Sequence, residues 1–363
     1  MTDRSGPQEP GDRPSEPDAI PDAPGAPASS RPIAHEDGDV GGAPSAGPPG
    51  ARTFTVEGRA APGLYWLGWV LTVVGAGLIG VAVLATTPGA ITALLLIIGL
   101  VVVGLGLVAA AGSQGIERRA RGVRGYAGPS PLLVFAASVP WTVLGSAAIA
   151  LPLSGILPAG SEPVVTVLAL LATGLVYVGL IHLLVVDARA LAWVEMGVRR
   201  PSGTTIRELT RGGLIALPVL LVSAAIAQVL SQFLALPEAV LPPAGDVAGA
   251  LLNLLAGAVI APVFEEVFFR GFATTAWART MEPARAIVRG AVFFAFVHVL
   301  TVGGATFGEG IERAAFAFIV RLPVSLALCW IFVRRGTLSS AIGMHATYNG
   351  IPLLLAPFAS LPA

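Results

Sequence analysis

Long, uninterrupted apolar runs fill the chain from residue 64 onwards and constrain its fold more than any other feature. Hydrophobic residues make up 54% of the 363 residues and charged residues 12%, whereas soluble domains carry roughly 25% charged residues. A helix rises about 1.5 Å per residue, so about 20 apolar residues cross a hydrocarbon core of roughly 30 Å. The runs are continuous and do not alternate with polar residues, which predicts helices rather than a membrane barrel of strands.

The fold predicted from these runs is an all-α, polytopic helical bundle of about nine transmembrane helices in a lipid bilayer. The candidate spans are residues 64–86, 90–112, 131–153, 163–187, 213–235, 248–272, 286–303, 312–333 and 338–358. We divide them into N-terminal transmembrane helices of unassigned role, residues 61–212, and a C-terminal group, residues 213–363, that contains the ionisable residues analysed below.

Arginine gathers in every second connection between these spans. The arginine-rich connections follow the second, fourth, sixth and eighth spans, at residues 118–124, 189–211, 279–289 and 334–335. The connections between them, at 154–162, 236–247 and 304–311, contain no arginine. Because short cytoplasmic loops of membrane proteins collect arginine, we predict a multi-pass protein of the cytoplasmic membrane with its N-terminus inside and its C-terminus outside.

Residues 1–60 differ from the rest of the chain in composition. They are rich in proline, glycine, serine and acidic residues and poor in aromatic and branched apolar residues, so they cannot bury enough surface to offset the entropy of ordering. We predict a disordered cytoplasmic tail. We expect no cleaved signal peptide, because the chain does not begin with a basic segment and a short apolar core. The formal net charge of zero offers no basic field for nucleic acid, which we do not expect as a partner.

Two further features are interpreted as packing. The stretch Gly75–Gly80, GAGLIG, matches a dinucleotide-binding pattern that works only between a strand and a helix, yet it lies inside a predicted span. Small residues that let membrane helices approach closely explain it better. Cys329, the one cysteine, lies in an apolar run and is predicted to be a small buried side chain.

The stretch APVFEEVFFRG places Glu265, Glu266 and Arg270 inside one of the most apolar parts of the chain. Each charge at the centre of a membrane helix costs on the order of 2.5–3.5 kcal/mol, so such residues are paired or face a wet cavity. Glu266 and Arg270 lie about 40° apart around a helix, whereas Glu265 is turned about 140° from Arg270. The spacing therefore predicts a Glu266–Arg270 ion pair and leaves Glu265 free to point elsewhere.

Two later spans each contain a polar pair at helical spacing. FFAFVHVL brings Phe294 and His298 to one helix face, and GMHATYNG does the same for His345 and Asn349. The other two histidines are interpreted as a tail residue and as an interfacial residue beside an arginine-rich connection: His35 and His182.

The predicted topology brings three of these residues to neighbouring depths. Glu265 and His345 lie about 10 Å, and His298 about 18 Å, from the cytoplasmic ends of their spans. Three different helices therefore present glutamate, histidine and asparagine side chains to one pocket in the inner half of the membrane.

These residue types are suited to hydrolysis by water. A glutamate can take a proton from water with the help of a histidine, while a second histidine and an asparagine amide hold an oxyanion. A metal is the alternative, because Glu265, His298 and His345 are also three possible zinc ligands with an open fourth position. The H-E-x-x-H pattern of zinc peptidases is absent, so we favour a mechanism without a cofactor and keep zinc as the alternative.

The three motifs, in this order, resemble those of the CPBP family of intramembrane glutamic endopeptidases, also called the CAAX protease and bacteriocin-processing family. The resemblance covers roughly residues 250–350 and implies that residues 213–363 form the protease core. It implies that the first glutamate and the first histidine activate water and that the second histidine and the asparagine form the oxyanion site: Glu265, His298, His345 and Asn349. It implies supporting roles for Glu266, Arg270 and Phe294. The implied substrate is a membrane-associated or lipidated protein or peptide, since a eukaryotic member cleaves after a prenylated cysteine.

Two other functions are considered for the same pocket. One is a non-hydrolytic membrane regulator or bacteriocin self-immunity protein, which would keep the pocket but act by binding a partner. The other is a proton-coupled transporter, because buried glutamate, histidine and arginine also build proton relays. Transporters tend to show repeated halves with interrupted helices at corresponding positions, and this sequence shows neither.

The orientation can be tested by labelling single introduced cysteines. We expect membrane-impermeant reagents to reach the 236–247 connection from outside, and the 114–125 connection only after the membrane is opened. The reverse pattern would contradict the topology and the predicted depth of the pocket.

Overall fold

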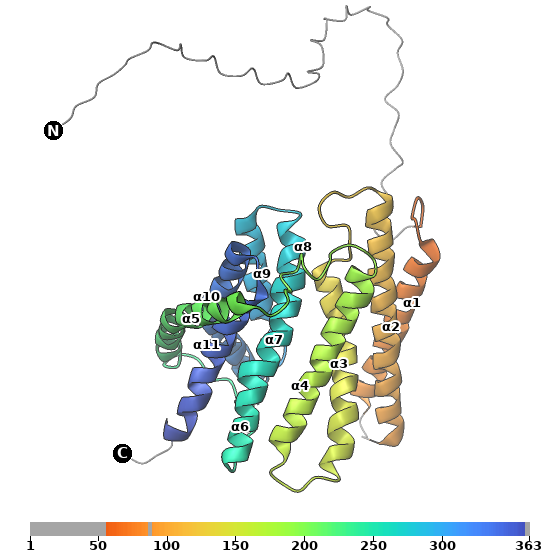
Figure 1. Ribbon diagram of the computed structural model, residues 1–363. Coiled ribbons are helices and arrows are strands. Elements are labelled where there is room, and N and C mark those ends of the chain that lie inside the picture. Colours follow the sequence, from red (N-terminus) through yellow and green to blue (C-terminus); the bar gives the residue numbers. More distant parts are fainter. Residues whose placement is uncertain (1–55, 86–88, 360–363) are drawn as a thin grey trace, which may run out of the picture. The chain divides into compact units, whose positions relative to one another are not determined.

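Helices form about three quarters of the described part of the chain, residues 56–85 and 89–359 of the computed structural model (Figure 1). No strand occurs within these ranges, so the predicted all-α class is confirmed. Nearly all of the predicted tail, residues 1–55, lies outside the described residues. The α-helices are α1 (Pro62–Leu84), α2 (Ala90–Ala120), α3 (Pro131–Ser154), α4 (Glu162–Ile181), α5 (Gly203–Leu230), α6 (Val247–Leu255), α7 (Ala261–Glu266), α8 (Thr275–Ala278), α9 (Pro283–Val297), α10 (Phe307–Arg335) and α11 (Leu338–Ala359). Three π-helical segments accompany them: η1 (His182–Val186), η2 (Ala256–Ile260) and η3 (Val267–Thr274).

Seven helices in the described residues are long and apolar enough to cross a membrane. Two of them are composite, because η1 continues α4, and α6 to α8 with η2 and η3 form one run, Val247–Ala278, of 32 residues. A helix is present at each of the nine predicted positions, but a count of nine crossings is not confirmed. α9 has only 15 residues, about 22 Å of helix, and α11 contains polar residues such as His345 and Asn349.

α1 and α2 pack closely where glycine removes the side chain from the contact. A Cβ atom at Gly75 would meet the backbone of Val103 and of Gly99, whereas Gly77 and Gly80 face open space. The packing interpretation of GAGLIG is therefore confirmed for its first glycine and wrong for the other two.

Aromatic side chains surround the central run from α6 to α8. Phe268, Phe269 and Phe272 of η3 are almost completely buried. Phe135 of α3 and Phe293 of α9 meet edge to face, with ring centroids 5.3 Å apart, and both also pack on Phe269. This cluster joins the central run to both α3 and α9, and so holds the helix that contains the glutamates.

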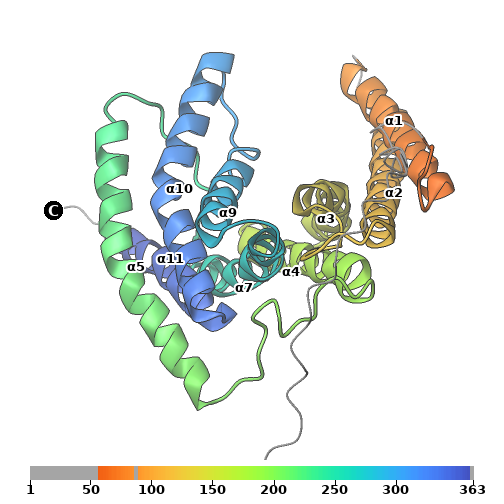
Figure 2. The same ribbon diagram turned by 90° about the horizontal axis from the view of Figure 1, so that it is seen from above.

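α5 and α10 run in a different direction from the neighbouring helices. Figure 2 shows these two helices side by side at full length, while α3 and α4 are seen nearly end-on. The carboxylate of Glu208 on α5 joins them, since it accepts hydrogen bonds of 2.9 and 2.6 Å from Nε and Nη2 of Arg335 on α10. Cys329 of α10 is completely buried, as predicted.

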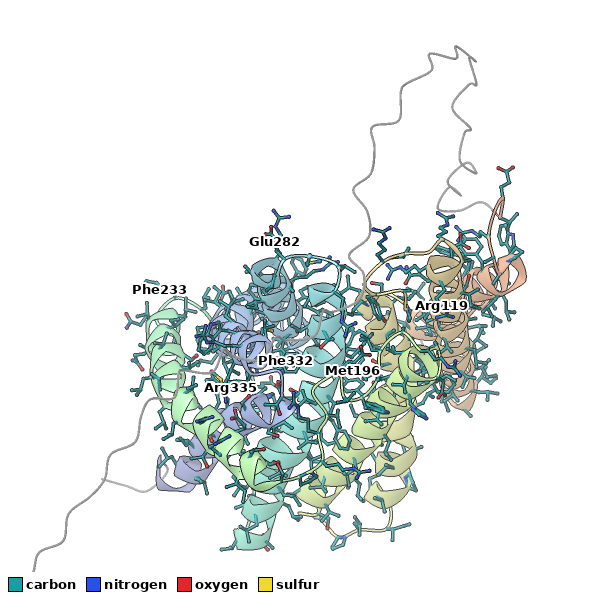
Figure 3. All side chains as sticks on the ribbon, turned by 45° about the horizontal axis from the view of Figure 1, so that its top comes forward. Arg119, Met196, Phe233, Glu282, Phe332 and Arg335 are labelled. Carbon is teal, nitrogen blue, oxygen red and sulfur yellow. The ribbon has the colours of Figure 1, made fainter. Side chains whose placement is uncertain are left out.

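The arginine-rich connections contact one another in the structure (Arg119 and Met196, from two of them, are labelled in Figure 3). Three hydrogen bonds join them: Arg119 to the Ala188 carbonyl at 3.4 Å, Arg279 to the Glu195 carboxylate at 2.7 Å, and Arg199 to the Gly336 carbonyl at 3.2 Å. The arginine-free connection 236–247 lies against α10 just after the connection 304–311, because Arg313 of α10 donates to Glu238 at 2.9 Å. This grouping supports the prediction that the arginine-rich connections lie together on one side of the membrane. Which side of the membrane faces the cytoplasm stays a prediction.

α11 crosses α5 so closely that the contact requires glycine at two positions. A Cβ atom at Gly343 would meet the backbone of Leu209, and one at Gly212 would meet the carbonyl oxygen of Ser340. Gly343 lies two residues before His345. The crossing therefore fixes the position from which this histidine reaches the interior.

We expect Gly343→Ala to lower the melting temperature of the protein in detergent, because the added methyl group must push α11 away from α5. Gly179→Ala in α4 is the matched control. No atom lies within 4 Å of a Cβ at that position, and alanine is the better helix former. Equal melting temperatures for the two variants, measured by thermal unfolding, would contradict the close crossing.

Candidate active site

The two glutamates lie at the end of α7, between the π-helical segments η2 and η3. Short π-helical turns inside α-helices are rare and often occur at functional sites, because they change the face on which the following side chains lie. Threonine hydroxyls bond to the shifted carbonyls of η3. Thr274 donates to the Phe269 carbonyl at 2.8 Å, and Thr275 donates to the Arg270 carbonyl at 3.4 Å.

Glu266 is the centre of a completely buried polar cluster. Its Oε1 accepts a hydrogen bond of 2.9 Å from Nη1 of Arg270 and one of 2.7 Å from Nδ1 of His345. Both side chains of the Glu266–Arg270 pair have 0% exposure, and the Arg270 guanidinium lies 4.0 Å from the centre of the Phe294 ring. The predicted ion pair is confirmed, and the cluster links the central helix run to α9 and α11.

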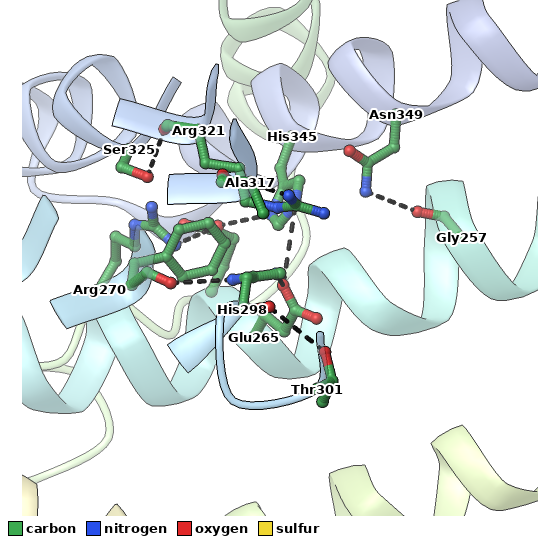
Figure 4. Close-up of polar contacts among 12 residues, drawn as sticks. Gly257, Glu265, Arg270, His298, Thr301, Ala317, Arg321, Ser325, His345 and Asn349 are labelled. Atoms are coloured by element: carbon green, nitrogen blue, oxygen red, sulfur yellow. Dashed lines mark hydrogen bonds and ion pairs between the residues drawn. The ribbon is translucent and has the colours of Figure 1, made fainter. Parts of the chain in front are cut away.

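Glu265 points away from this pair, into a partly open site (Figure 4). Its side chain is 25% exposed, and its Oε2 lies 3.8 Å from Nε2 of His345 and 4.0 Å from Nε2 of His298. These distances are too long for direct hydrogen bonds and suit bridging by a water molecule. The structure therefore brings together the glutamate and the two histidines that the sequence singled out.

Hydrogen bonds define which nitrogen of each imidazole holds a proton. Nδ1 of His298 lies 2.8 Å from the carbonyl oxygen of Phe294, and since a carbonyl only accepts, Nδ1 is the donor. Nδ1 of His345 donates to the Glu266 carboxylate in the same way. Both neutral rings therefore direct an unprotonated Nε2 towards Glu265.

The surroundings of His298 differ from the prediction in one respect. The predicted span 286–303 extends too far, because α9 ends at Val297 and His298 caps its C-terminus. The ring of His298 packs against that of Phe294 at a centroid distance of 4.5 Å, as their spacing predicts. His298 thus reaches the site from the end of a short helix instead of from the middle of a span.

Asn349 differs from the other site residues in its hydrogen-bond partner. Its Nδ2 donates to the carbonyl oxygen of Gly257 in η2 at 2.9 Å. Among the described residues, no hydrogen bond joins its amide to Glu265 or to either histidine of the site. One amide hydrogen of Asn349 is already used, and one is left for a ligand.

The donor geometry does not fit the alternative zinc site. Within residues 56–85 and 89–359, no three histidine, cysteine, aspartate or glutamate side chains are grouped so that they could hold a metal ion. We therefore derive no step through zinc. Of the other histidines, His182 is exposed and lies 3.6 Å from Asp187, and His35 lies outside the described residues.

Arg321 of α10 is a site residue that the sequence analysis missed. Figure 4 shows its side chain reaching from α10 towards Glu265. The residues three and four positions away on either side are all uncharged, so the helix itself offers no ion pair. An arginine in this setting inside an apolar span is a signal of function.

The C-terminal part of the chain is thus a helical membrane segment with a buried Glu–Arg–His cluster and an adjoining glutamate and histidine site. Residues 247–351 match the family model described as Type II CAAX prenyl endopeptidase Rce1-like. The matched segment contains all three motifs, so the resemblance to the CAAX protease family is confirmed over these residues. No curated protein and no solved structure matches the chain.

We expect the two neighbouring glutamates to respond differently to substitution. Glu266→Gln and Arg270→Met should each lose most of the folded protein, because removing one member of a buried ion pair costs about 3–5 kcal/mol. Glu265→Gln should keep the fold, since its side chain makes no hydrogen bond within 3.5 Å in the described residues. Size-exclusion profiles and melting temperatures in detergent measure the difference, and similar losses in all three variants would contradict it.

Proposed function

We propose that this protein is an intramembrane endopeptidase in which Glu265 and His298 activate a water molecule. The substrate is a peptide bond in a membrane-associated or lipidated protein or peptide. The observation that supports this most directly is the position of Glu265, whose Oε2 lies 3.8 and 4.0 Å from two imidazole Nε2 atoms. A partly exposed carboxylate between two hydrogen-bond acceptors is suited to hold water and remove its proton.

In this proposal, Glu265 takes a proton from the water as the water oxygen attacks the carbonyl carbon of the substrate. The carbonyl electrons move to oxygen and form a tetrahedral oxyanion. When the intermediate collapses, the C–O double bond re-forms and the C–N bond breaks. The proton held by Glu265 passes to the departing nitrogen, with His298 positioned to assist.

The same proposal assigns oxyanion binding to His345 and Asn349. Asn349 has one amide hydrogen that its bond to Gly257 leaves unused. His345 can donate through Nε2 only as an imidazolium, because Nδ1–H is directed at Glu266.

Glu266 is unsuited to the role of base although it is next to Glu265 in the chain. Its Oε1 already accepts two hydrogen bonds, and the side chain is completely buried. A carboxylate paired with arginine and sealed from water holds its neighbours in place instead of exchanging protons. We assign Glu266, Arg270 and Phe294 to the support of His345 and His298.

The experiment is cleavage of a peptide library, with and without a C-terminal lipid, by purified protein in detergent. We expect Glu265→Gln to reduce the rate about 10²- to 10⁴-fold, the usual contribution of a general base, without loss of folded protein. Glu162→Gln at the exposed start of α4 is the control and should cleave at the wild-type rate. Mass spectrometry of the products measures the rate and locates the cleaved bond.

Each assay is repeated with a strong chelator. Activity that survives chelation and disappears in Glu265→Gln supports a glutamate peptidase without metal. Activity that chelation removes and zinc restores would contradict the metal-free mechanism. A well-folded wild-type protein that cleaves no peptide would contradict the proposed endopeptidase activity and favour the regulatory or immunity function.

A further inference from the structure

Arg321 is held inside the C-terminal helices without an acidic partner. In the described residues the only hydrogen bond of its guanidinium is from Nη1 to the Ala317 carbonyl of its own helix, at 3.3 Å, and no carboxylate oxygen lies within 4.0 Å. Its other nitrogens are not among the buried polar atoms that lack a partner. These nitrogens are therefore not sealed in the interior, and Figure 4 shows the side chain reaching towards Glu265.

The two comparable arginines of the matched segment both have acidic partners. Arg270 pairs with Glu266 at 2.9 Å, and Arg313 pairs with Glu309 at 2.8 Å and with Glu238. Charges in apolar surroundings are normally paired or used, because leaving one unpaired is costly. Arg321 differs from the others in that its natural partner, an anion, is not supplied by the described chain.

The polar groups around Glu265 provide few hydrogen-bond donors. His298 and His345, when neutral, both direct acceptor nitrogens towards it, because their protons are used by Phe294 and Glu266. Asn349 has committed one of its two amide hydrogens. A guanidinium has five N–H donors and cannot lose its charge, so Arg321 is the strongest donor directed at this site.

We propose that Arg321 is a further catalytic residue, whose guanidinium binds the carbonyl oxygen of the substrate as that oxygen becomes negative. The inference rests on the proposed endopeptidase function and adds to it. The negative charge of the step passes from Glu265, which gains a proton from water, to the substrate oxygen, which gains the electron pair of the carbonyl bond. The Arg321 side chain reaches towards Glu265 (Figure 4), so it lies beside the groups between which the charge moves.

Kinetics of two Arg321 variants test this assignment. Arg321→Gln should lower kcat about 10²- to 10³-fold, as loss of one oxyanion donor does, with KM nearly unchanged. Arg321→Lys keeps the charge and should recover part of kcat. Arg313→Gln, eight residues earlier on α10, is the matched control and should keep the wild-type kcat.

A second readout separates this role from a structural one. A peptide phosphinate mimics the tetrahedral anion, and we expect Arg321→Gln to weaken its binding in proportion to the loss of kcat. Binding of the uncleaved peptide to the same variant should be unchanged. A rise in KM with kcat unchanged, equal weakening of both ligands, or a wild-type kcat in Arg321→Gln would each overturn the assignment.

Failure of the endopeptidase function itself would give a different result. If the folded wild type cleaves no peptide but binds the phosphinate through Arg321, the proposed endopeptidase function is wrong. Arg321 is then part of an anion-binding site without catalysis. If phosphinate binding is also independent of Arg321, both proposals are overturned.

Discussion

The buried interaction of Glu266 with Arg270 and His345 is the constraint around which the C-terminal helices are arranged. It joins the central helix run to α11, and the guanidinium also stacks on Phe294 of α9. Glu266 Oε2 and two Arg270 nitrogens have no hydrogen-bond partner among the described residues. A pair that is only partly satisfied contributes little net stability compared with apolar residues of the same size. The pair instead orients the ring of His345, because two apolar side chains could not accept the hydrogen bond from its Nδ1 proton.

That orientation also depends on how closely the helix backbones approach. His345 can reach Glu266 because Gly343 and Gly212 allow α11 to cross α5 without intervening side chains. On the opposite side, the aromatic cluster of η3 fixes the central run against α3 and α9. The polar cluster therefore does not assemble the helices by itself. Packing brings its members within reach, and the hydrogen bonds then select one arrangement.

Sequence reasoning succeeded where local periodicity decides the outcome. The helix positions follow from apolar runs, and the Glu266–Arg270 pair follows from a four-residue spacing that survives even though η3 is π-helical. Periodicity cannot locate contacts between segments far apart in the chain, so the bond from Asn349 to Gly257 was not predicted. It also cannot show that α9 ends at Val297, because the apolar composition continues beyond the helix.

Two adjacent glutamates thus acquire different chemistry from the same helix. The backbone turns their side chains in different directions, so Glu266 is buried with two donors on a single oxygen, while Glu265 is partly exposed and faces the Nε2 atoms of two imidazoles. In the proposed function Glu265 is the base and Glu266 is not, because Oε1 of Glu266 already accepts two hydrogen bonds. The remaining unpaired charge at the site, Arg321, is placed where negative charge would develop in hydrolysis. Under the proposed function, the buried carboxylate holds the site together and the partly exposed carboxylate acts on water.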